Sequence, residues 1–195
     1  MELNLPPPNM RSVCKNNVSL DGDFNNKVYF LHINNISYMY EDFSINIGLK
    51  ELKPQIDFAY GHCICTGLGF LLRENYLINK PEVTKVTVIE NNQNVIDLQN
   101  ELNPNIMSKL NIIHDNANLY QGECDCLLLD HFILPEENLS IIDKCFKNIN
   151  HKLLWWWDIT HSYDYQLYIS KLKDMFNTLP DLTEEEYNNY LDIRK

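Results

Sequence analysis

The sequence predicts an α/β fold in which a mostly parallel, twisted sheet carries helices on both faces and follows an N-terminal β-hairpin. Strand-like and helix-like segments alternate along most of the 195 residues, as they do in parallel sheets. A glycine turn, Gly67-Leu68-Gly69, directly follows a short apolar segment. An acid, Glu90, ends the next strand-like segment, at the spacing of nucleotide-binding βαβ units. These three observations predict a ligand site at the carboxyl ends of the strands.

A single domain suits this chain, because one core can serve 195 residues of which 45% are hydrophobic. Residues 1–25 contain three successive prolines and several asparagines, so we expect a flexible arm that does not contribute to the core. Residues 26–195 should form the domain. Its expected parts are a hairpin over 27–41, a cofactor-binding core over 58–160 and C-terminal helices over 163–194.

The hairpin is predicted by two β-prone segments, Val28–Ile33 and Ile36–Tyr40, on either side of Asn34-Asn35. Asparagine tolerates the left-handed backbone that a two-residue hairpin turn requires. The next segment, 43–52, fits either a short helix or another strand, and Gly48 weakens the helical interpretation.

The central βαβ unit begins with a strand over His62–Thr66 and continues after the glycine turn as a helix over Phe70–Leu77. Asn79-Lys80-Pro81 ends this helix, because proline cannot continue it and also restricts the preceding residue. A second strand over Lys85–Ile89 then leads to Glu90.

The second half of the chain continues the alternation. Apolar residues recur at helical spacing over Asn94–Leu102, and Pro104 should end that helix. Another helix is expected over Leu139–Phe146. Three more strands are expected, over Leu110–His114, Asp125–Asp130 and Lys152–Trp157.

Composition narrows the classes of partner. The net charge is −11, with 16 Lys and Arg against 27 Asp and Glu, which argues against a nucleic-acid surface and favours a small-molecule or cationic substrate. No apolar segment approaches the roughly 18 residues of a membrane span, so we expect no membrane contact and a soluble, cytoplasmic protein. The sequence is compatible with a homodimer.

Six cysteines include two Cys-x-Cys pairs, at the first and fourth predicted strands. This fold would place those strands side by side, so a thiolate metal site is one interpretation. Strand geometry fits the packing of small apolar side chains better than tetrahedral zinc, and we expect reduced thiols and no metal.

The region from roughly Tyr38 to Asp130 resembles the class I S-adenosylmethionine-dependent methyltransferases, and within them the branch similar to spermidine synthase. The glycine turn continues into Arg73-Glu74, which looks like the Arg-Glu pair of aminopropyltransferases. Lys80-Pro81-Glu82-Val83 leads into the second strand, and Asn94-Val95-Ile96-Asp97-Leu98 opens the next helix as in that branch. The resemblance implies the Rossmann-like fold of class I methyltransferases.

The resemblance also implies S-adenosylmethionine as the cofactor. Glu90 would bind the ribose hydroxyls, and Asp115 would bind the adenine amine. Asp130, followed by His131, stands where the branch keeps a catalytic acid. The implied cofactor-binding residues are Thr66, Gly67, Leu68, Gly69, Glu90, Asn91, Asp115, Asn116 and Ala117.

Each candidate also has a purely structural interpretation. Glu90 could be a solvated strand end, and Asp115-Asn116 is ordinary turn chemistry. Asp130 could cap a helix, or could act as a proton acceptor or an anchor for a cation. His131 could be a general base, but a lone histidine is more often packed and hydrogen-bonded.

The leading functional hypothesis is therefore an S-adenosylmethionine-dependent methyltransferase. Aminopropyl transfer to a polyamine is an alternative, motivated by Arg73-Glu74 and by the acidic charge. A nicotinamide dehydrogenase is a third, although Leu72 stands where the dinucleotide fingerprint has its third glycine. A non-catalytic binding module with the same fold is a fourth, motivated by Leu68 and by the cysteines of the first strand.

Overall fold

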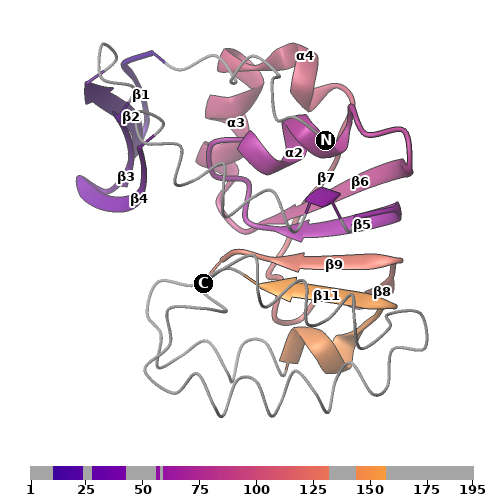
Figure 1. Ribbon diagram of the computed structural model, residues 1–195. Coiled ribbons are helices and arrows are strands. Elements are labelled where there is room, and N and C mark those ends of the chain that lie inside the picture. The colour runs from indigo at the N-terminus through magenta and orange to yellow at the C-terminus, as the bar shows by residue number, and fades with distance from the viewer. Residues whose placement is uncertain (1–10, 24–27, 43–55, 58, 132–143, 157–195) are drawn as a thin grey trace, which may run out of the picture.

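The computed structural model describes residues 11–23, 28–42, 56–57, 59–131 and 144–156, and every structural statement below concerns these residues. Within them lie a four-stranded antiparallel sheet, a five-stranded parallel sheet and a short two-stranded parallel pair (Figure 1). The expectations for the segment 43–52 and for the C-terminal helices fall outside the described residues.

The five-stranded sheet confirms the predicted parallel α/β architecture. Its strands are β5 (Gly61–Thr66), β6 (Val83–Glu90), β7 (Asn111–His114), β9 (Cys126–Leu129) and β11 (Leu153–Trp156). Their order in space is β11-β9-β5-β6-β7, and every neighbouring pair is parallel. The chain starts in the middle at β5, proceeds to one edge and returns to β9 on the other side. Such a reversal opens a crevice at the carboxyl ends of β5 and β9.

Helix α2 (Leu72–Leu77) connects β5 to β6, and helices α3 (Gln93–Leu102) and α4 (Pro104–Met107) connect β6 to β7. Helix α2 begins later than predicted, because Leu71 has a left-handed backbone with φ of 61° and still belongs to the turn. Helix α3 begins at a cap in which the Asn92 side chain accepts a hydrogen bond from the Asn94 N–H. Pro104 follows the end of α3 as predicted and also starts α4, since the first helical turn needs no N–H from proline.

The antiparallel sheet confirms the predicted hairpin. Its strands are β1 (Val13–Lys15), β2 (Val18–Asp23), β3 (Val28–Ile33) and β4 (Ile36–Asp42), in that order. Asn34 and Asn35 join β3 to β4 with φ of 54° and 62°, the left-handed conformation that asparagine was expected to adopt.

The prediction of a flexible arm over residues 1–25 was wrong for residues 13–23, which form β1 and β2. Val18 and Leu20 are buried in the core, and β2 pairs along its full length with β3. Val18 and Leu20 are two residues apart on a strand, so both point to the same, buried face. The three prolines at positions 6–8 and the asparagines among residues 1–25 obscured that alternation.

Two short strands, β8 (Gly122–Glu123) and β10 (Ile149–Asn150), were not predicted and pair in parallel. Residues 144–148 are helical, which agrees with the end of the predicted helix over Leu139–Phe146. Among the described helices, none has the length and apolar character needed to cross a bilayer.

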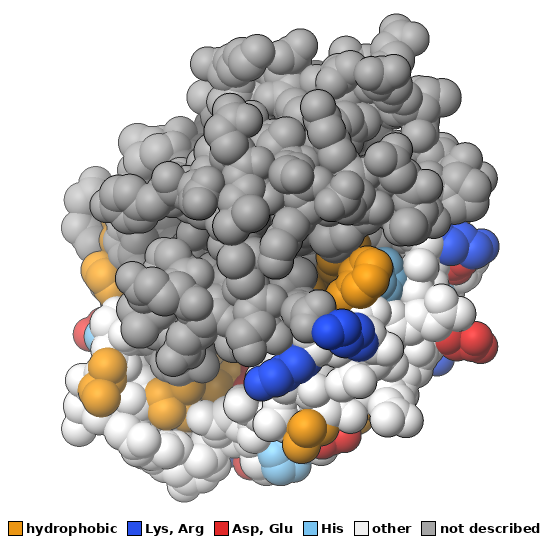
Figure 2. All heavy atoms as spheres, turned by 90° about the horizontal axis from the view of Figure 1, so that it is seen from below, with side chains coloured by type: hydrophobic (Ala, Val, Ile, Leu, Met, Phe, Trp, Pro, Cys, Tyr) orange, Lys and Arg blue, Asp and Glu red, His pale blue; other side chains and the backbone are white. Residues whose placement is uncertain are grey.

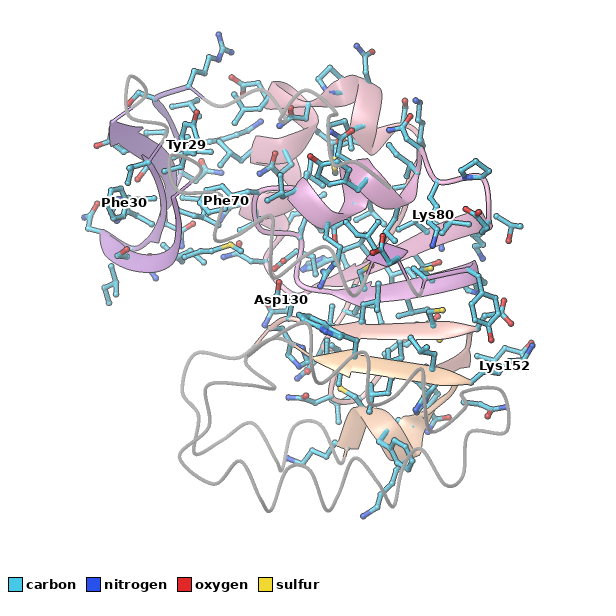
Figure 3. All side chains as sticks on the ribbon, in the orientation of Figure 1. Tyr29, Phe30, Phe70, Lys80, Asp130 and Lys152 are labelled. Carbon is cyan, nitrogen blue, oxygen red and sulfur yellow. The ribbon has the colours of Figure 1, made fainter. Side chains whose placement is uncertain are left out.

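The core of the parallel sheet includes the paired cysteines. Strands β5 and β9 are neighbours, as the sequence predicted, and Cys63 of β5 lies opposite Cys126 of β9, with both side chains fully buried. No group of three or more potential metal ligands occurs in the described part of the chain. Figure 3 shows Asp130 at the carboxyl ends of the strands and Lys152 at the opposite end of the sheet.

Candidate functional site

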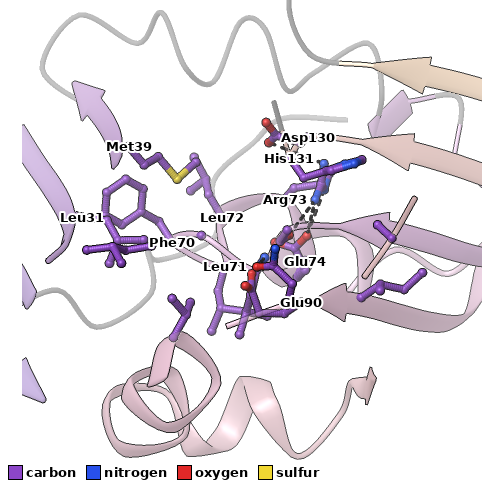
Figure 4. Close-up of a pocket in the computed structure, with 18 of the residues that line it drawn as sticks. Leu31, Met39, Phe70, Leu71, Leu72, Arg73, Glu74, Glu90, Asp130 and His131 are labelled. Carbon is purple, nitrogen blue, oxygen red and sulfur yellow. Dashed lines mark hydrogen bonds and ion pairs between the residues drawn. The ribbon is translucent and has the colours of Figure 1, made fainter. Parts of the chain in front are cut away.

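A cavity of about 240 Å³ lies at the carboxyl ends of β5, β6, β7 and β9. All of the predicted site residues except Thr66 line it. Thr66 is buried directly behind them and contacts His131. The fold therefore brings together residues that span more than sixty positions of the sequence, from Gly67 to His131, as Figure 4 shows in part.

The glycine turn needs glycine at both positions. Gly67 has φ of 77°, and a Cβ there would lie 2.5 Å from the backbone oxygen of Asp130. Gly69 has φ of 44°, and a Cβ there would lie 2.7 Å from the sulfur of Met39 on the antiparallel sheet. The turn is thus fitted between the end of β9 and the N-terminal sheet.

Glu90 is bonded to this turn. The Leu68 N–H donates to Glu90 Oε2 at 2.9 Å, and the Asn92 N–H donates to Glu90 Oε1 at 2.8 Å. Glu90 is buried, and this desolvation raises the pKa of its carboxyl, while the backbone N–H donors of Leu68 and Asn92 oppose the rise. The glycine turn and Glu90, which the sequence predicted as parts of one ligand site, are therefore in direct contact and face the same cavity.

Arg73, Glu74 and Asp130 form a charged cluster at one end of the cavity (Figure 4). Arg73 donates from Nε and Nη2 to Glu74 Oε1 at 2.9 and 2.8 Å, and its Nη1 lies 3.6 Å from Asp130 Oδ2. Burial works against the charge of Arg73, but the neighbouring Glu74, Cys65 and Asp130 together outweigh it, and the pKa of Arg73 is raised. Arg73 also donates to the Gly67 carbonyl oxygen at 3.3 Å, so it ties the glycine turn to the end of β9.

His131 is held in a hydrogen-bonded chain. The Asp130 N–H donates to Thr66 Oγ1 at 3.0 Å, so the Thr66 hydroxyl proton is directed to His131 Nδ1, 2.6 Å away. His131 Nε2 then donates to Asn118 Oδ1 at 3.1 Å. Burial, with a smaller effect from Arg73, lowers the pKa of His131 to about 4, so it is neutral at pH 7. This arrangement favours a packed, hydrogen-bonded histidine over a general base.

The loop after β7 brings the third predicted group to the cavity. The Asp115 N–H donates to the Glu90 carbonyl oxygen at 3.1 Å. Asp115 Oδ1 accepts from the Asn116 N–H at 2.7 Å, and both of these side chains are exposed, whereas Ala117 is buried. Asp115, Asn116 and Ala117 therefore border the cavity beside Glu90, where the adenine of an adenosyl ligand was expected.

The chain is similar in fold to spermidine synthase. The spermidine synthase from Thermotoga maritima aligns with 12% identity and a TM-score of 0.46, over 73% of this chain and 53% of that one. A spermidine synthase in complex with the transition-state analogue AdoDATO aligns with 12% identity and a TM-score of 0.47, again over 73% of this chain and 53% of that one. TrmN from Thermus thermophilus aligns with 13% identity and a TM-score of 0.41, over 62% of this chain and 42% of that one.

The aligned region thus spans about half the length of these structures. Neither a protein-family model nor a curated protein sequence matches the chain. The strand order β11-β9-β5-β6-β7, with all neighbours parallel, is itself the Rossmann-like arrangement that the sequence predicted.

The sequence did not predict the contribution of the N-terminal sheet. Leu31, Ile33 and Met39 line the cavity, and Figure 4 shows the Phe70 ring beside Leu31 and Met39, at the end of the pocket away from Arg73. Apolar residues in a hairpin predict one buried face, but they do not say which part of the chain covers it. The close fit of Met39 against Gly69 emerges only from the three-dimensional packing.

Proposed function

We propose that the protein is an S-adenosylmethionine-dependent methyltransferase that acts on a small-molecule or cationic acceptor. The observation that supports this most is the hydrogen bond from the Leu68 N–H to the Glu90 carboxylate within one cavity. It joins the glycine turn to the acid of the next strand at the crevice where open α/β sheets bind ligands.

Glu90 has the hydrogen-bonding capacity for ribose. The Leu68 and Asn92 N–H groups each donate to one of its oxygens, and the Asn91 backbone also acts on the carboxylate. A carboxylate has about four acceptor sites, so a ribose hydroxyl could still donate to it without displacing these partners. Asp115 beside it is the candidate for the adenine amine, and the Gly67-Leu68-Gly69 turn is the candidate for the methionine portion.

The charges around the cavity favour a cationic ligand. Among the described lining residues, Arg73 is the basic side chain and is already paired with Glu74, whereas Glu90, Asp115 and Asp130 add negative charge. His131 is neutral at pH 7. A sulfonium suits such a site, while a pyrophosphate would be repelled, so the nicotinamide alternative is disfavoured.

Asp130 is the candidate for the acceptor side. It lies at the carboxyl end of β9, and about a quarter of its side chain is exposed. S-adenosylmethionine would supply an electrophilic methyl group, which passes to a nucleophilic atom of the acceptor while the thioether leaves. Asp130 would hold a cationic acceptor or accept the proton released from it, and positioning would supply most of the rate.

Aminopropyl transfer remains a second candidate because Arg73, Glu74 and Asp130 are grouped at one end of the cavity. The buried Leu68 counts against it, since no carboxylate stands there to bind an aminopropyl ammonium. The non-catalytic alternative would be favoured by a side chain that plugs the crevice. The Phe70 ring instead lies beside Leu31 and Met39, away from Glu90 (Figure 4).

Isothermal titration calorimetry with S-adenosylhomocysteine tests the proposal. We expect a Kd in roughly the micromolar range, and we expect Glu90→Ala to weaken it about a hundredfold because hydrogen bonds to a charged group are lost. Lys109→Ala, on an exposed residue outside the cavity, should leave the Kd unchanged. No heat of binding with folded wild-type protein would contradict the proposal.

A further inference from the structure

Gln99 is a polar residue on the buried side of α3. It is completely inaccessible to solvent, and its helix neighbours on that side are the apolar Val95, Leu98 and Leu102. A buried amide without partners is unfavourable, so its hydrogen bonds show what it contacts.

Both ends of the Gln99 amide are bonded. Its Nε2 donates to the Gly69 carbonyl oxygen at 2.6 Å, and its Oε1 accepts from Asn103 Nδ2 at 2.8 Å. Asn103 is also buried. Because Asn103 presents a donor to Oε1, the amide of Gln99 is oriented with its own N–H groups toward the glycine turn.

This bond fixes the direction of one peptide group of the turn. The described chain has no cis peptide bond, and in a planar trans peptide the C=O and N–H groups point in opposite directions. The Gly69 carbonyl points toward α3, so the Phe70 N–H points away from α3. Gly69 and Phe70 both line the cavity.

The turn has a backbone that requires such support. Gly67, Gly69 and Leu71 all have positive φ, which is unfavourable for leucine. Arg73 holds the Gly67 carbonyl from the side of β9, and Gln99 holds the Gly69 carbonyl from the side of α3. Neither Gln99 nor Asn103 lines the cavity, so each acts on a ligand only through the turn.

We propose that Gln99, supported by Asn103, is a positioning residue that fixes the glycine turn for the amino-acid portion of S-adenosylmethionine. The inference rests on the proposed function. It divides the ligand into two parts, because Glu90 is also held by the Asn92 N–H and Asp115 lies on the loop after β7, so the adenosine portion depends less on the turn than the amino-acid portion does. Loss of the Gln99 amide should therefore weaken the binding of ligands whose amino-acid portion reaches the turn. It should have little effect on the binding of adenosine, which lacks that portion.

Calorimetry with S-adenosylhomocysteine and with adenosine separates these portions. Gln99→Met keeps the side-chain volume but loses the hydrogen-bond donor. In this variant the affinity for S-adenosylhomocysteine, divided by the affinity for adenosine, should fall about tenfold, as expected for the loss of one hydrogen bond. Leu98→Ala is the matched control, because Leu98 is equally buried on the same helix and lies outside the cavity. It should reduce stability and leave the ratio unchanged.

An unchanged ratio in Gln99→Met would overturn the inference and leave the proposed function intact. Equal weakening of both ligands would also overturn it, since that is the result of a merely structural role. If Gln99→Met does not fold, Asn103→Ala serves instead and should lower the ratio about threefold; an unchanged ratio there overturns the inference too. If the folded wild type binds neither S-adenosylhomocysteine nor adenosine, the proposed function and this inference are both overturned.

Discussion

At the scale of single residues, the site depends on buried ionisable side chains that are held by hydrogen-bonded or charged partners. Glu90 is buried as a hydrogen-bonded acid, and Arg73 is buried between Glu74 and Asp130. A buried ion pair is unfavourable to break, because one partner would remain as an uncompensated charge. Arg73 therefore fixes the relative positions of the turn and of the end of β9 more than it adds net stability.

His131 makes stability depend on pH. The folded protein holds the pKa of His131 at about 4, below the usual 6.5, so between these values the unfolded chain binds more protons than the folded one. The stabilisation is fully present above about pH 6.5 and is lost as the pH falls toward 4. His131 should contribute about 3 kcal/mol to this change.

Urea unfolding of the wild type and of His131→Gln at several pH values measures this contribution. The free energy of unfolding of His131→Gln should fall less steeply between pH 6.5 and 4, whereas the remaining acids keep their own dependence in both proteins. Identical slopes for the two proteins would show that His131 is not held neutral by the fold.

At the scale of elements, the N-terminal sheet belongs to the folded core and supplies one wall of the cavity through Leu31, Ile33 and Met39. Side chains tie it to α3, where Asn16 donates to Asn94 Oδ1 at 2.8 Å and Asn94 donates to Asn17 Oδ1 at 2.7 Å. These bonds give some of the many asparagines a structural role that the sequence alone did not reveal.

Leu20 tests whether β2 is part of the core. Leu20→Ala should destabilise the protein by about 2–5 kcal/mol, because a fully buried side chain would leave a cavity. Ile36→Ala, in the same sheet but 69% exposed, should change the free energy of unfolding by less than about 0.5 kcal/mol. Equal, small effects in urea unfolding would restore the interpretation of residues 13–23 as a loose arm.

The elements that the sequence predicted are those with a local signal. The apolar run of β5, the glycine turn, Glu90 and the Asn34-Asn35 turn each carry their own chemistry, and all four are where they were expected. Strands β1, β2, β8 and β10 are short or rich in polar residues, so their sequences carry no clear strand signal. Whether these segments form strands depends on the strands with which they pair. The Gln99 bond to Gly69 joins positions thirty residues apart, and no spacing rule predicts it.

At the scale of the whole molecule, acids outnumber bases by 27 to 16, and the cavity follows the same trend. On the face shown in Figure 2, the described basic side chains occur at several separate places with acids near them. Overall charge steers a ligand of opposite sign toward the protein, and the local acids determine what is held. Both scales therefore favour a positively charged ligand.

The central claim is that the glycine turn and Glu90 together hold an adenosyl ligand. A crystal structure of the protein with S-adenosylhomocysteine tests it most directly. We expect both ribose hydroxyls within about 3 Å of the Glu90 carboxylate oxygens and the amino-acid portion against Gly67-Leu68-Gly69. A ligand bound elsewhere, with Glu90 contacting only the backbone of Leu68 and Asn92, would contradict the claim.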